Sequence, residues 1–188
     1  MSRYQKITSF ANIVKKNKTL IICDIDETIL HFTTDDIQVN DNWWDQKKRQ
    51  YMETYGCDSK TAGEQAYYEW HEFVNTTSPQ FTDQIGFVKM LDKLNKKNSD
   101  IIFLTARKQE TRDLTHKHFS IIGINPNKFE LHFTSLNPKG PYIKKNINTS
   151  IYEKVIFIDD AKHNLDSVYE TFNGKIDCYH FNLINEHN

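Results

Sequence analysis

Short apolar runs that alternate with amphipathic stretches constrain the fold of this chain more than any other feature of its sequence. Four runs of five residues are rich in β-branched and aromatic side chains, which is typical of strands buried on both faces of a sheet. They are residues 19–23, 100–104, 129–133 and 154–158, and a fifth, alternating run covers 175–181. Because helical patterns lie between strands, we expect a doubly wound, parallel, Rossmann-like α/β sheet.

Three stretches have the apolar periodicity of amphipathic helices. For residues 81–98 the predicted buried stripe is Phe81, Ile85, Val88, Leu91 and Leu94. For residues 110–124 it is Leu114, His118, Phe119 and Ile122, and for 161–174 it is Leu165, Val168, Tyr169 and Phe172. Gly123 and Gly174 follow the last two stripes and are predicted to stop those helices.

Residues 33–80 interrupt this alternation and carry no strand pattern. They contain two aromatic-rich helical candidates near 42–55 and 61–75, the second opened by a possible capping box, Thr61 and Glu64. We therefore expect an α/β core from residues 1–32 and 81–188, with 33–80 as a small helical insertion. Among its aromatic residues, Trp70 is expected to pack in the interior, whereas Trp43 and Trp44 could pack or line a pocket.

Composition limits the classes of function that need to be considered. The 188 residues suit one domain with a small insertion, and the net charge of −1 supplies no basic field for nucleic acid. Residues 35–80 hold nine acidic and four basic side chains, a net charge of −5, which disfavours long polyanions and points to a small substrate. Oligomeric state is not predictable from these features.

Cellular location is expected to be cytoplasmic. No secretory leader or membrane span is recognisable, although secretion without a cleaved leader would leave no trace in the sequence. Cys23, Cys57 and Cys178 match no metal or disulfide spacing, and free thiols are expected.

Polar side chains follow each of the four buried strands, where an open parallel sheet binds its ligands. They are Asp24, Asp26 and Thr28 after the first strand, Thr105, Ala106 and Arg107 after the second, Lys139 in the loop after the third, and Asp159, Asp160 and Asn164 after the fourth. Carboxylates in a buried position are costly unless something pairs with them. Several carboxylates from two strands therefore favour a bound cation, and Mg²⁺ prefers such oxygen ligands.

In chain order, "DIDET", "LTAR", a lysine before a helix and "FIDDAKHN" resemble the four motifs of the haloacid dehalogenase superfamily. Its members are mostly Mg²⁺-dependent phosphatases that work through an aspartyl-phosphate. The insertion after the first motif sits where that superfamily places a small helical cap of the C1 type. The resemblance implies a hydrolase of the phosphomonoesterase class that acts on a small phosphorylated substrate.

The same resemblance implies roles for individual residues. Asp24 would be the nucleophile and a metal ligand, and Asp26 would be the general acid and base, with its backbone carbonyl on the metal. Thr105, Ala106 and Lys139 would bind the phosphoryl group. Asp160 would ligate the metal directly. Asp159 would either bind the metal through a water molecule or support the ligands without contacting the metal. Thr28, Arg107 and Asn164 would support these groups, with Arg107 as an ion-pair partner.

Several alternatives remain open at this stage. Lys144 and Lys145 compete with Lys139 for the role of the lysine, and Asp159 competes with Asp160 as direct ligand. The same intermediate could serve a phosphotransferase or phosphomutase. "DIDETILHF" also resembles the opening of the phosphatases that act on the tail of RNA polymerase, so a phosphoprotein substrate stays possible. A binding protein that kept the fold without catalysis is the non-enzyme alternative.

Overall fold

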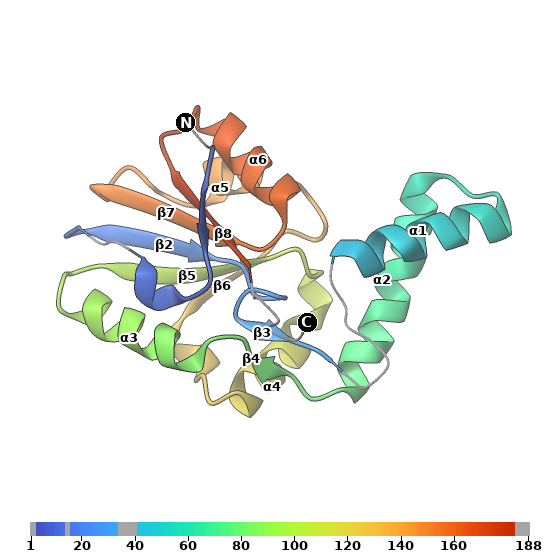
Figure 1. Ribbon diagram of the computed structural model, residues 1–188, viewed down its shortest axis with the longest axis horizontal. Helices are drawn as coiled ribbons and strands as arrows, with labels where there is room; N and C mark the ends of the chain where they lie inside the picture. The colour runs from blue at the N-terminus through green and yellow to red at the C-terminus, as the bar shows by residue number, and fades with distance from the viewer. Residues whose placement is uncertain (1–2, 14–15, 34–40, 183–188) are drawn as a thin grey trace.

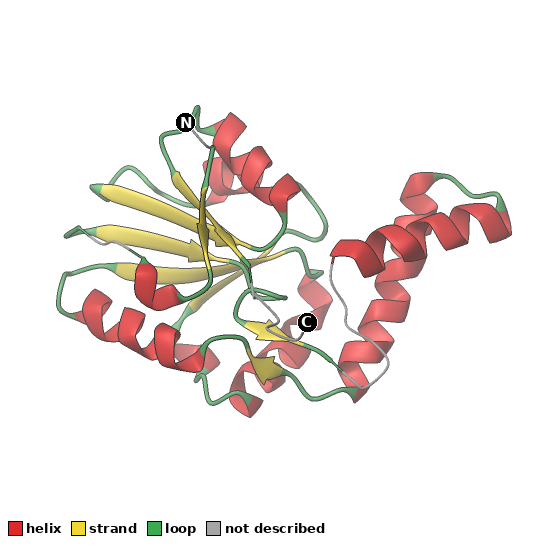
Figure 2. Cartoon of the chain, viewed as in Figure 1, coloured by secondary structure: helices red, strands yellow, loops and turns green. Residues whose placement is uncertain are grey.

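A six-stranded parallel sheet forms the centre of the computed structural model, which describes residues 3–13, 16–33 and 41–182. Its strand order is β1-β8-β7-β2-β5-β6, with helices on both faces (Figures 1 and 2). The strands are β1 (Gln5–Ile7), β2 (Thr19–Cys23), β5 (Asp100–Thr105), β6 (Glu130–Phe133), β7 (Lys154–Asp159) and β8 (Asp177–Phe181). The predicted doubly wound α/β fold is confirmed.

The helices follow the strands that they cover. They are α3 (Gln84–Asn95), α4 (Arg112–Ile121), α5 (Lys139–Asn146) and α6 (Lys162–Thr171), with short 3₁₀ turns η1 (Phe10–Asn12), η2 (Gln109–Thr111) and η3 (Pro126–Lys128). The edge strand β1 was not predicted, because a three-residue segment with two exposed polar side chains carries no strand pattern. As predicted, Gly123 and Gly174 follow α4 and α6, each with a positive φ that favours glycine.

The side chains of strand β2 contribute to two hydrophobic cores, one on each face of the sheet. Ile21 and Cys23 point to the face covered by α3 and α4, whereas Leu20 and Ile22 point to the face covered by α5 and α6. Because successive side chains of a strand alternate between faces, a run that is apolar throughout is needed when both faces are covered. Burial of β2 on both sides fixes the position of its carboxyl end.

The helical stripe predicted for residues 81–98 is wrong at three positions, the first of which, Phe81, lies before α3 in a short strand, Gln80–Phe81. Ile85 and Val88 are 72% and 49% exposed, and the buried face consists of Gly86, Phe87, Met90 and Leu94. The reason is the anchor at the start of the helix: the Asp83 carboxylate accepts hydrogen bonds from the Ser9 hydroxyl at 2.6 Å and the Phe10 amide at 2.9 Å. This contact turns Phe87 toward Phe10, with the ring centroids 5.7 Å apart.

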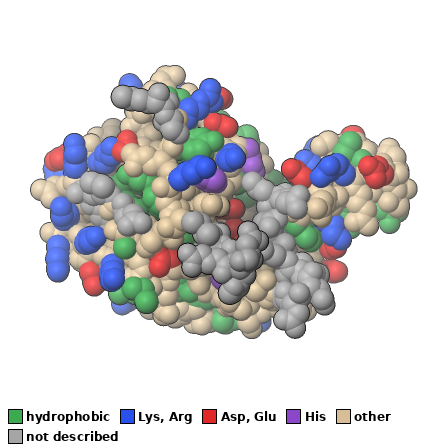
Figure 3. Space-filling view, in the orientation of Figure 1, with side chains coloured by type: hydrophobic (Ala, Val, Ile, Leu, Met, Phe, Trp, Pro, Cys, Tyr) green, Lys and Arg blue, Asp and Glu red, His purple; other side chains and the backbone are tan. Residues whose placement is uncertain are grey.

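Helices α1 (Asp41–Tyr55) and α2 (Ser59–Thr76), here called the helical pair, lie between β3 (Leu30–His31) and β4 (Gln80–Phe81). Those two short strands pair in antiparallel fashion, so the chain leaves and re-enters the core at one place. The space-filling view shows the helical pair projecting as a lobe beside the body of the molecule (Figure 3). No helix in the described ranges is both long and apolar enough to cross a bilayer.

The start of α2 differs from the prediction. Asp58 caps the helix, and its carboxylate accepts a hydrogen bond from the Thr61 amide at 2.8 Å, so Thr61 is the donor partner and not the cap. A carboxylate at this position also interacts favourably with the positive end of the helix dipole, which explains the earlier start. The thiols of Cys23, Cys57 and Cys178 are free.

Candidate active site

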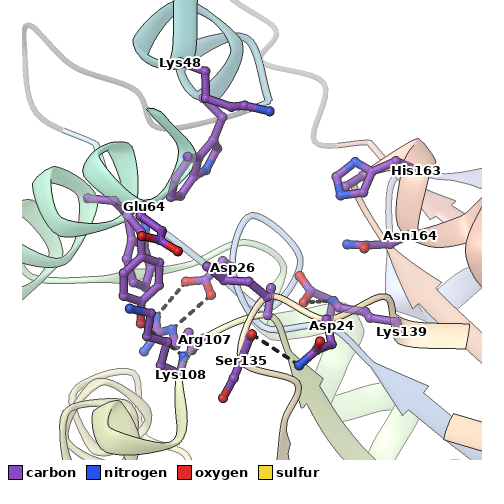
Figure 4. A pocket seen from close by; sticks show the side chains of 18 of the residues that line it. Asp24, Asp26, Lys48, Glu64, Arg107, Lys108, Ser135, Lys139, His163 and Asn164 are labelled. Carbon is purple, nitrogen blue, oxygen red and sulfur yellow. Dashed lines mark hydrogen bonds and ion pairs between the residues drawn. The ribbon is translucent and has the colours of Figure 1, made fainter. Parts of the chain in front are cut away.

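A cavity of about 940 Å³ opens at the carboxyl edge of the sheet, between the strand ends and the helical pair. The core supplies its floor, including Asp24, Asp26 and Lys139, and the helical pair supplies the opposite wall. Figure 4 shows Lys48 and Glu64 on that wall, facing His163 and Asn164 across the cavity. Most of the strand-end residues predicted from the sequence therefore border one space. The exceptions are Thr28, Thr105 and Asp159, which are fully buried and do not line the cavity.

Asp24 lies at the floor of the cavity and is almost fully buried. Its amide donates to the Ile158 carbonyl of β7 at 2.9 Å, which extends the pairing of β2 with β7 by one residue. Its carboxylate accepts a hydrogen bond from the ammonium of Lys139, and the same ammonium donates to Asp159 at 2.7 Å. One buried cation thus joins the ends of two adjacent strands.

Lys139 reaches this position because α5 approaches α6 very closely. A Cβ atom at Gly140 would lie 2.1 Å from the Ser167 carbonyl oxygen, so only glycine allows this contact. The Gly140 amide donates to the Ser167 hydroxyl at 3.1 Å and holds the first turn of α5 in place. Lys144 and Lys145 lie in the last turn of α5 and are exposed. Of the three candidate lysines, the structure places Lys139 beside Asp24.

Burial and charge oppose each other in this cluster. Burial raises the pKa of Asp24 above its ordinary value, the Lys139 ammonium lowers it, and the Asp159 carboxylate adds to the rise. Burial acts to lower the pKa of Lys139, but the charges of Asp159 and Asp24 outweigh it and raise that pKa. Lys139 therefore keeps its positive charge, which offsets negative charge on the carboxylates of Asp24 and Asp159.

Asp159 and Asp160 have different surroundings. Asp159 is fully buried, and its carboxylate accepts hydrogen bonds from Lys139, from the Ala161 amide at 2.9 Å and from the Asn164 side chain at 3.1 Å. Asp160 borders the cavity, and its carboxylate accepts a bond from the buried Thr28 hydroxyl at 3.3 Å. Asp160 is therefore better placed to bind a ligand, while Asp159 is held by the protein.

Acidic oxygens gather here in a way that fits a divalent cation. Ligand atoms of Asp24, Asp159 and Asp160 all lie within 4.8 Å of one another. When all three carboxylates are ionised, the single ammonium of Lys139 leaves two negative charges, which matches the charge of Mg²⁺. The donor set consists entirely of oxygen atoms, as Mg²⁺ prefers.

Asp26 points away from this cluster, toward Arg107 (Figure 4). Arg107 donates from Nε to one carboxylate oxygen at 3.0 Å and from Nη2 to the other at 2.6 Å. The Thr105 hydroxyl also donates to Asp26 at 3.3 Å and accepts from the Arg107 amide at 3.1 Å. Thr105 is fully buried and does not border the cavity, so its contact with a phosphoryl group stays a prediction.

The cavity wall includes aromatic and charged residues of the helical pair, and the sequence reasoning missed the charged ones. Trp44, Tyr67 and Trp70 supply aromatic surface, and Asp45, Lys48, Lys60 and Glu64 supply mixed charge from the helical pair. The net negative charge of the insertion is therefore not concentrated at the cavity. Trp70 is buried as predicted. Trp44 lines the cavity, which answers for this residue the question whether Trp43 and Trp44 pack or line a pocket.

A strained loop after β6 completes the wall. Ser135 and Leu136 both have positive φ, +51° and +64°, which is uncommon for residues other than glycine. Their amides donate to the carbonyls of Arg107 at 3.1 Å and Ala106 at 2.9 Å, so this loop is tied to the loop after β5. Leu136 remains about half exposed and borders the cavity. Such strain is often found beside ligand sites, and only the backbone geometry reveals it.

The structure thus defines a doubly wound α/β protein with an acidic, lysine-bearing site at the carboxyl edge of its sheet. The chain belongs to the family described as protein of unknown function DUF2608, whose model matches residues 3–137. That match includes Asp24, Asp26 and Arg107 and ends before Lys139. No curated protein matches the chain by sequence.

Solved structures with a similar fold come from several bacteria. A protein of Thermotoga maritima provisionally identified as a beta-phosphoglucomutase aligns at 10% identity with a TM-score of 0.49, over 87% of this chain and 94% of that one. The tungstate-bound class C acid phosphatase of Bacillus anthracis aligns at 16% identity and a TM-score of 0.46, over 90% and 69%. The Legionella pneumophila effector Ceg4, solved with an N-terminal yeast Hog1p sequence, aligns at 12% identity and a TM-score of 0.49, over 92% and 91%.

Proposed function

We propose that this protein is a Mg²⁺-dependent phosphomonoesterase of the haloacid dehalogenase type, which acts through an aspartyl-phosphate on a small phosphorylated substrate. The observation that carries the proposal is the cluster at the sheet edge. Asp24 and Asp159 share Lys139, Asp160 lies beside them, and Asp26 stands two residues further on at the same cavity. Three of the four motifs, distant from one another in sequence, supply this cluster.

Asp24 and Asp160 would hold the metal, together with the backbone carbonyl of Asp26. Asp159 supports them, because its oxygens already accept bonds from Lys139, Ala161 and Asn164. When bound, Mg²⁺ neutralises charge on the phosphoryl group and orients it.

In the first half of the reaction, a carboxylate oxygen of Asp24 attacks phosphorus and the bond from phosphorus to the ester oxygen breaks. Asp26 gives its proton to that leaving oxygen, so an alcohol departs and Asp24 carries the phosphoryl group. Lys139 is positioned to balance the negative charge beside Asp24 throughout, without reorganisation of the site.

In the second half, water attacks the phosphorus of the aspartyl-phosphate. Asp26, now ionised, accepts a proton from that water, and inorganic phosphate and free Asp24 result.

The helical pair is proposed to act as the cap that selects the substrate. Its aromatic residues and mixed charges face the cluster across the cavity, and the size of the cavity suits a small molecule. A closed cap would also keep bulk water away from the phosphoryl transfer.

Hydrolysis of 4-nitrophenyl phosphate with and without Mg²⁺ tests the proposal, in wild type and Asp24→Asn. We expect wild-type activity that requires the metal and a loss on the order of 10⁴-fold or more in the variant, because the nucleophile is absent. Asp92→Asn, an exposed carboxylate on α3, is the matched control and should hydrolyse at the wild-type rate. Equal rates in wild type and Asp24→Asn would refute the proposed chemistry.

A further inference from the structure

Arg107 connects the proposed acid and base, Asp26, to a helix of the helical pair. We propose that Arg107 is a positioning residue for Asp26, and that its contacts with Trp70 and His118 make the placement of Asp26 depend on how α2 docks on the core. The proposal rests on the proposed function, since only that function gives Asp26 a proton to transfer.

The first part of the argument is the fork between the two side chains. Arg107 contacts both oxygens of Asp26 from two different nitrogens, at 3.0 Å and 2.6 Å. A planar guanidinium paired in this way fixes the direction as well as the distance of a carboxylate, which a lysine ammonium does not. The Asp26 side chain is 27% exposed at the cavity, and the 3.3 Å bond from the Thr105 hydroxyl reaches only one of its oxygens, so the fork is what fixes the direction of the carboxylate.

The second part is what holds the other side of the guanidinium. Nη1 donates to the Thr115 hydroxyl at 2.9 Å and to His118 Nδ1 at 3.1 Å, both on α4. Because an arginine can only donate, His118 Nδ1 must be the acceptor and its Nε2 must carry the proton. His118 Nε2 then donates to the Val74 carbonyl of α2 at 3.0 Å.

The third part is a direct contact with α2. The guanidinium carbon of Arg107 lies 5.2 Å from the centre of the Trp70 ring, within the range of a cation–π interaction. Trp70 is almost fully buried and also borders the cavity. Arg107 is therefore held between Asp26 on one side and two positions of α2 on the other, one direct and one through His118.

Energetic considerations favour a positioning role over simple packing. The Arg107 side chain is 1% exposed, and a buried ion pair is often no more stabilising than apolar side chains of similar volume. Here four N–H groups of one buried arginine are directed to three different side chains. Any shift of α2 that moves Trp70 or the Val74 carbonyl must be taken up by this network, and a displacement of about 1 Å at a catalytic group can cost about 10²-fold in rate.

Arg107→Lys tests the fork, because it keeps the charge and loses the bidentate geometry. Rates should be compared along a series of aryl phosphates from 4-nitrophenyl to unsubstituted phenyl, whose leaving oxygens need protonation to increasing degrees. We expect kcat to fall about 10²-fold for phenyl phosphate, to fall much less for 4-nitrophenyl phosphate, and KM to change little. Equal losses for both esters would indicate a merely structural role and overturn the proposal.

Arg112→Lys is the matched control. Arg112 is also on the α4 side of the molecule, where it packs over the Phe133 ring at 4.7 Å and donates to the Leu131 carbonyl. Its substitution should lower kcat equally, if at all, along the ester series.

Trp70→Leu tests the connection to α2. We expect it to lower kcat for phenyl phosphate in wild type and to have no further effect on kcat in Asp26→Asn, because both changes act on the same group. Tyr51→Phe, which removes a 2.9 Å hydrogen bond to Glu69 inside the helical pair, should leave both backgrounds unchanged. Additive losses from Trp70→Leu and Asp26→Asn would overturn the connection.

A measurement without turnover separates this proposal from the proposed function. The buried Nε–H of Arg107 should give a slowly exchanging ¹⁵N–¹H signal, which Asp26→Asn shifts directly and Trp70→Leu shifts through the guanidinium. An unchanged signal in Trp70→Leu refutes the connection even if the protein is a phosphatase. Failure of the Asp24→Asn test refutes the phosphatase function, whatever this signal does.

Discussion

Asp24 and Asp26 are two residues apart, yet their surroundings differ. Asp24 lies wholly within the α/β core, whereas Asp26 lies where the core meets the helical pair. The partners of Asp24 come from β7 and from the start of α5, and all are buried. The partners of Asp26 are the Thr105 hydroxyl and Arg107, and Arg107 in turn contacts α2. The Asp24 side chain is 6% exposed, whereas the Asp26 side chain is 27% exposed at the cavity wall.

This difference suits the two proposed tasks. A nucleophile needs a fixed position and a constant counter-charge, and burial between two strands supplies both. An acid and base must face solvent or substrate and exchange a proton, which requires access. The position of Asp24 and its partners, here called the Asp24 side, thus depends on contacts within the core. The position of Asp26 and its partners, the Asp26 side, also depends on the helical pair.

The largest expected effect on stability is on the Asp24 side. Lys139→Met would leave Asp24 and Asp159 buried without their shared cation, so we expect the free energy of unfolding to fall by about 3–5 kcal/mol. Urea unfolding at neutral pH without divalent metal measures it. Lys144→Met, on the exposed part of the same helix, should stay within about 0.5 kcal/mol of wild type. Similar midpoints for both variants would show that the core cation does not stabilise this side.

A second prediction tests how the core places that cation. Gly140→Ala would put a methyl group 2.1 Å from the Ser167 carbonyl oxygen, so α5 must move away from α6 and carry Lys139 with it. We expect a loss of about 3 kcal/mol in unfolding free energy, together with reduced hydrolysis of aryl phosphates.

Gly63→Ala is the control for this glycine. A Cβ atom there would meet only the Lys48 Cε at 4.0 Å, and Gly63 lies inside α2, where alanine is favoured by about 0.5–1 kcal/mol. The two substitutions should therefore change stability in opposite directions. If Gly140→Ala were as stable as wild type, close packing of α5 on α6 would not be what places Lys139.

The fold and the floor of the site were predictable because both depend on local sequence. Apolar runs identify the strands, and the carboxyl ends of parallel strands meet at one edge, so Asp24 and Asp159 were expected at the same edge. That they are neighbours follows from the pairing of β2 with β7, which only the structure gives. The sequence favoured Lys139 over Lys144 and Lys145, but the detailed placement of its ammonium beside Asp24 was not predictable. It follows from a backbone contact between Gly140 and Ser167, which are distant in sequence.

The wall of the site was less predictable, because it depends on docking. The sequence indicated an ion pair for Arg107 but not that Asp26 would be its partner. The contacts of Trp70 and Val74 with Arg107 and His118 join segments whose sequences carry no signal for each other. Likewise, the exposure of Ile85 and Val88 on α3 follows from the anchor between Asp83 and Ser9, which periodicity does not encode.

The smallest expected effect concerns the Asp26 side and depends on pH. Burial, reinforced by the charge of Arg107, lowers the pKa of His118 from its ordinary 6.5 to about 4. Well above pH 6.5 the histidine is neutral in both folded and unfolded protein, so it causes no pH dependence there. As the pH falls from 6.5 toward 4, the unfolded chain binds a proton that the folded protein does not, and stability is lost. We expect this histidine to account for about 2 kcal/mol between pH 7 and pH 5.

His118→Gln isolates that contribution. Glutamine offers one acceptor for Arg107 and one donor for the Val74 carbonyl, as the neutral histidine does, but it does not titrate. Urea unfolding of both proteins at pH 7 and pH 5 should therefore show a smaller loss in the variant, by about 2 kcal/mol. Because Lys139 and Asp24 are present in both proteins, their titration cancels in the difference. An equal loss of unfolding free energy in the two proteins would mean that His118 is protonated within the folded protein at pH 5. The link from Arg107 to α2 would then not require a neutral histidine.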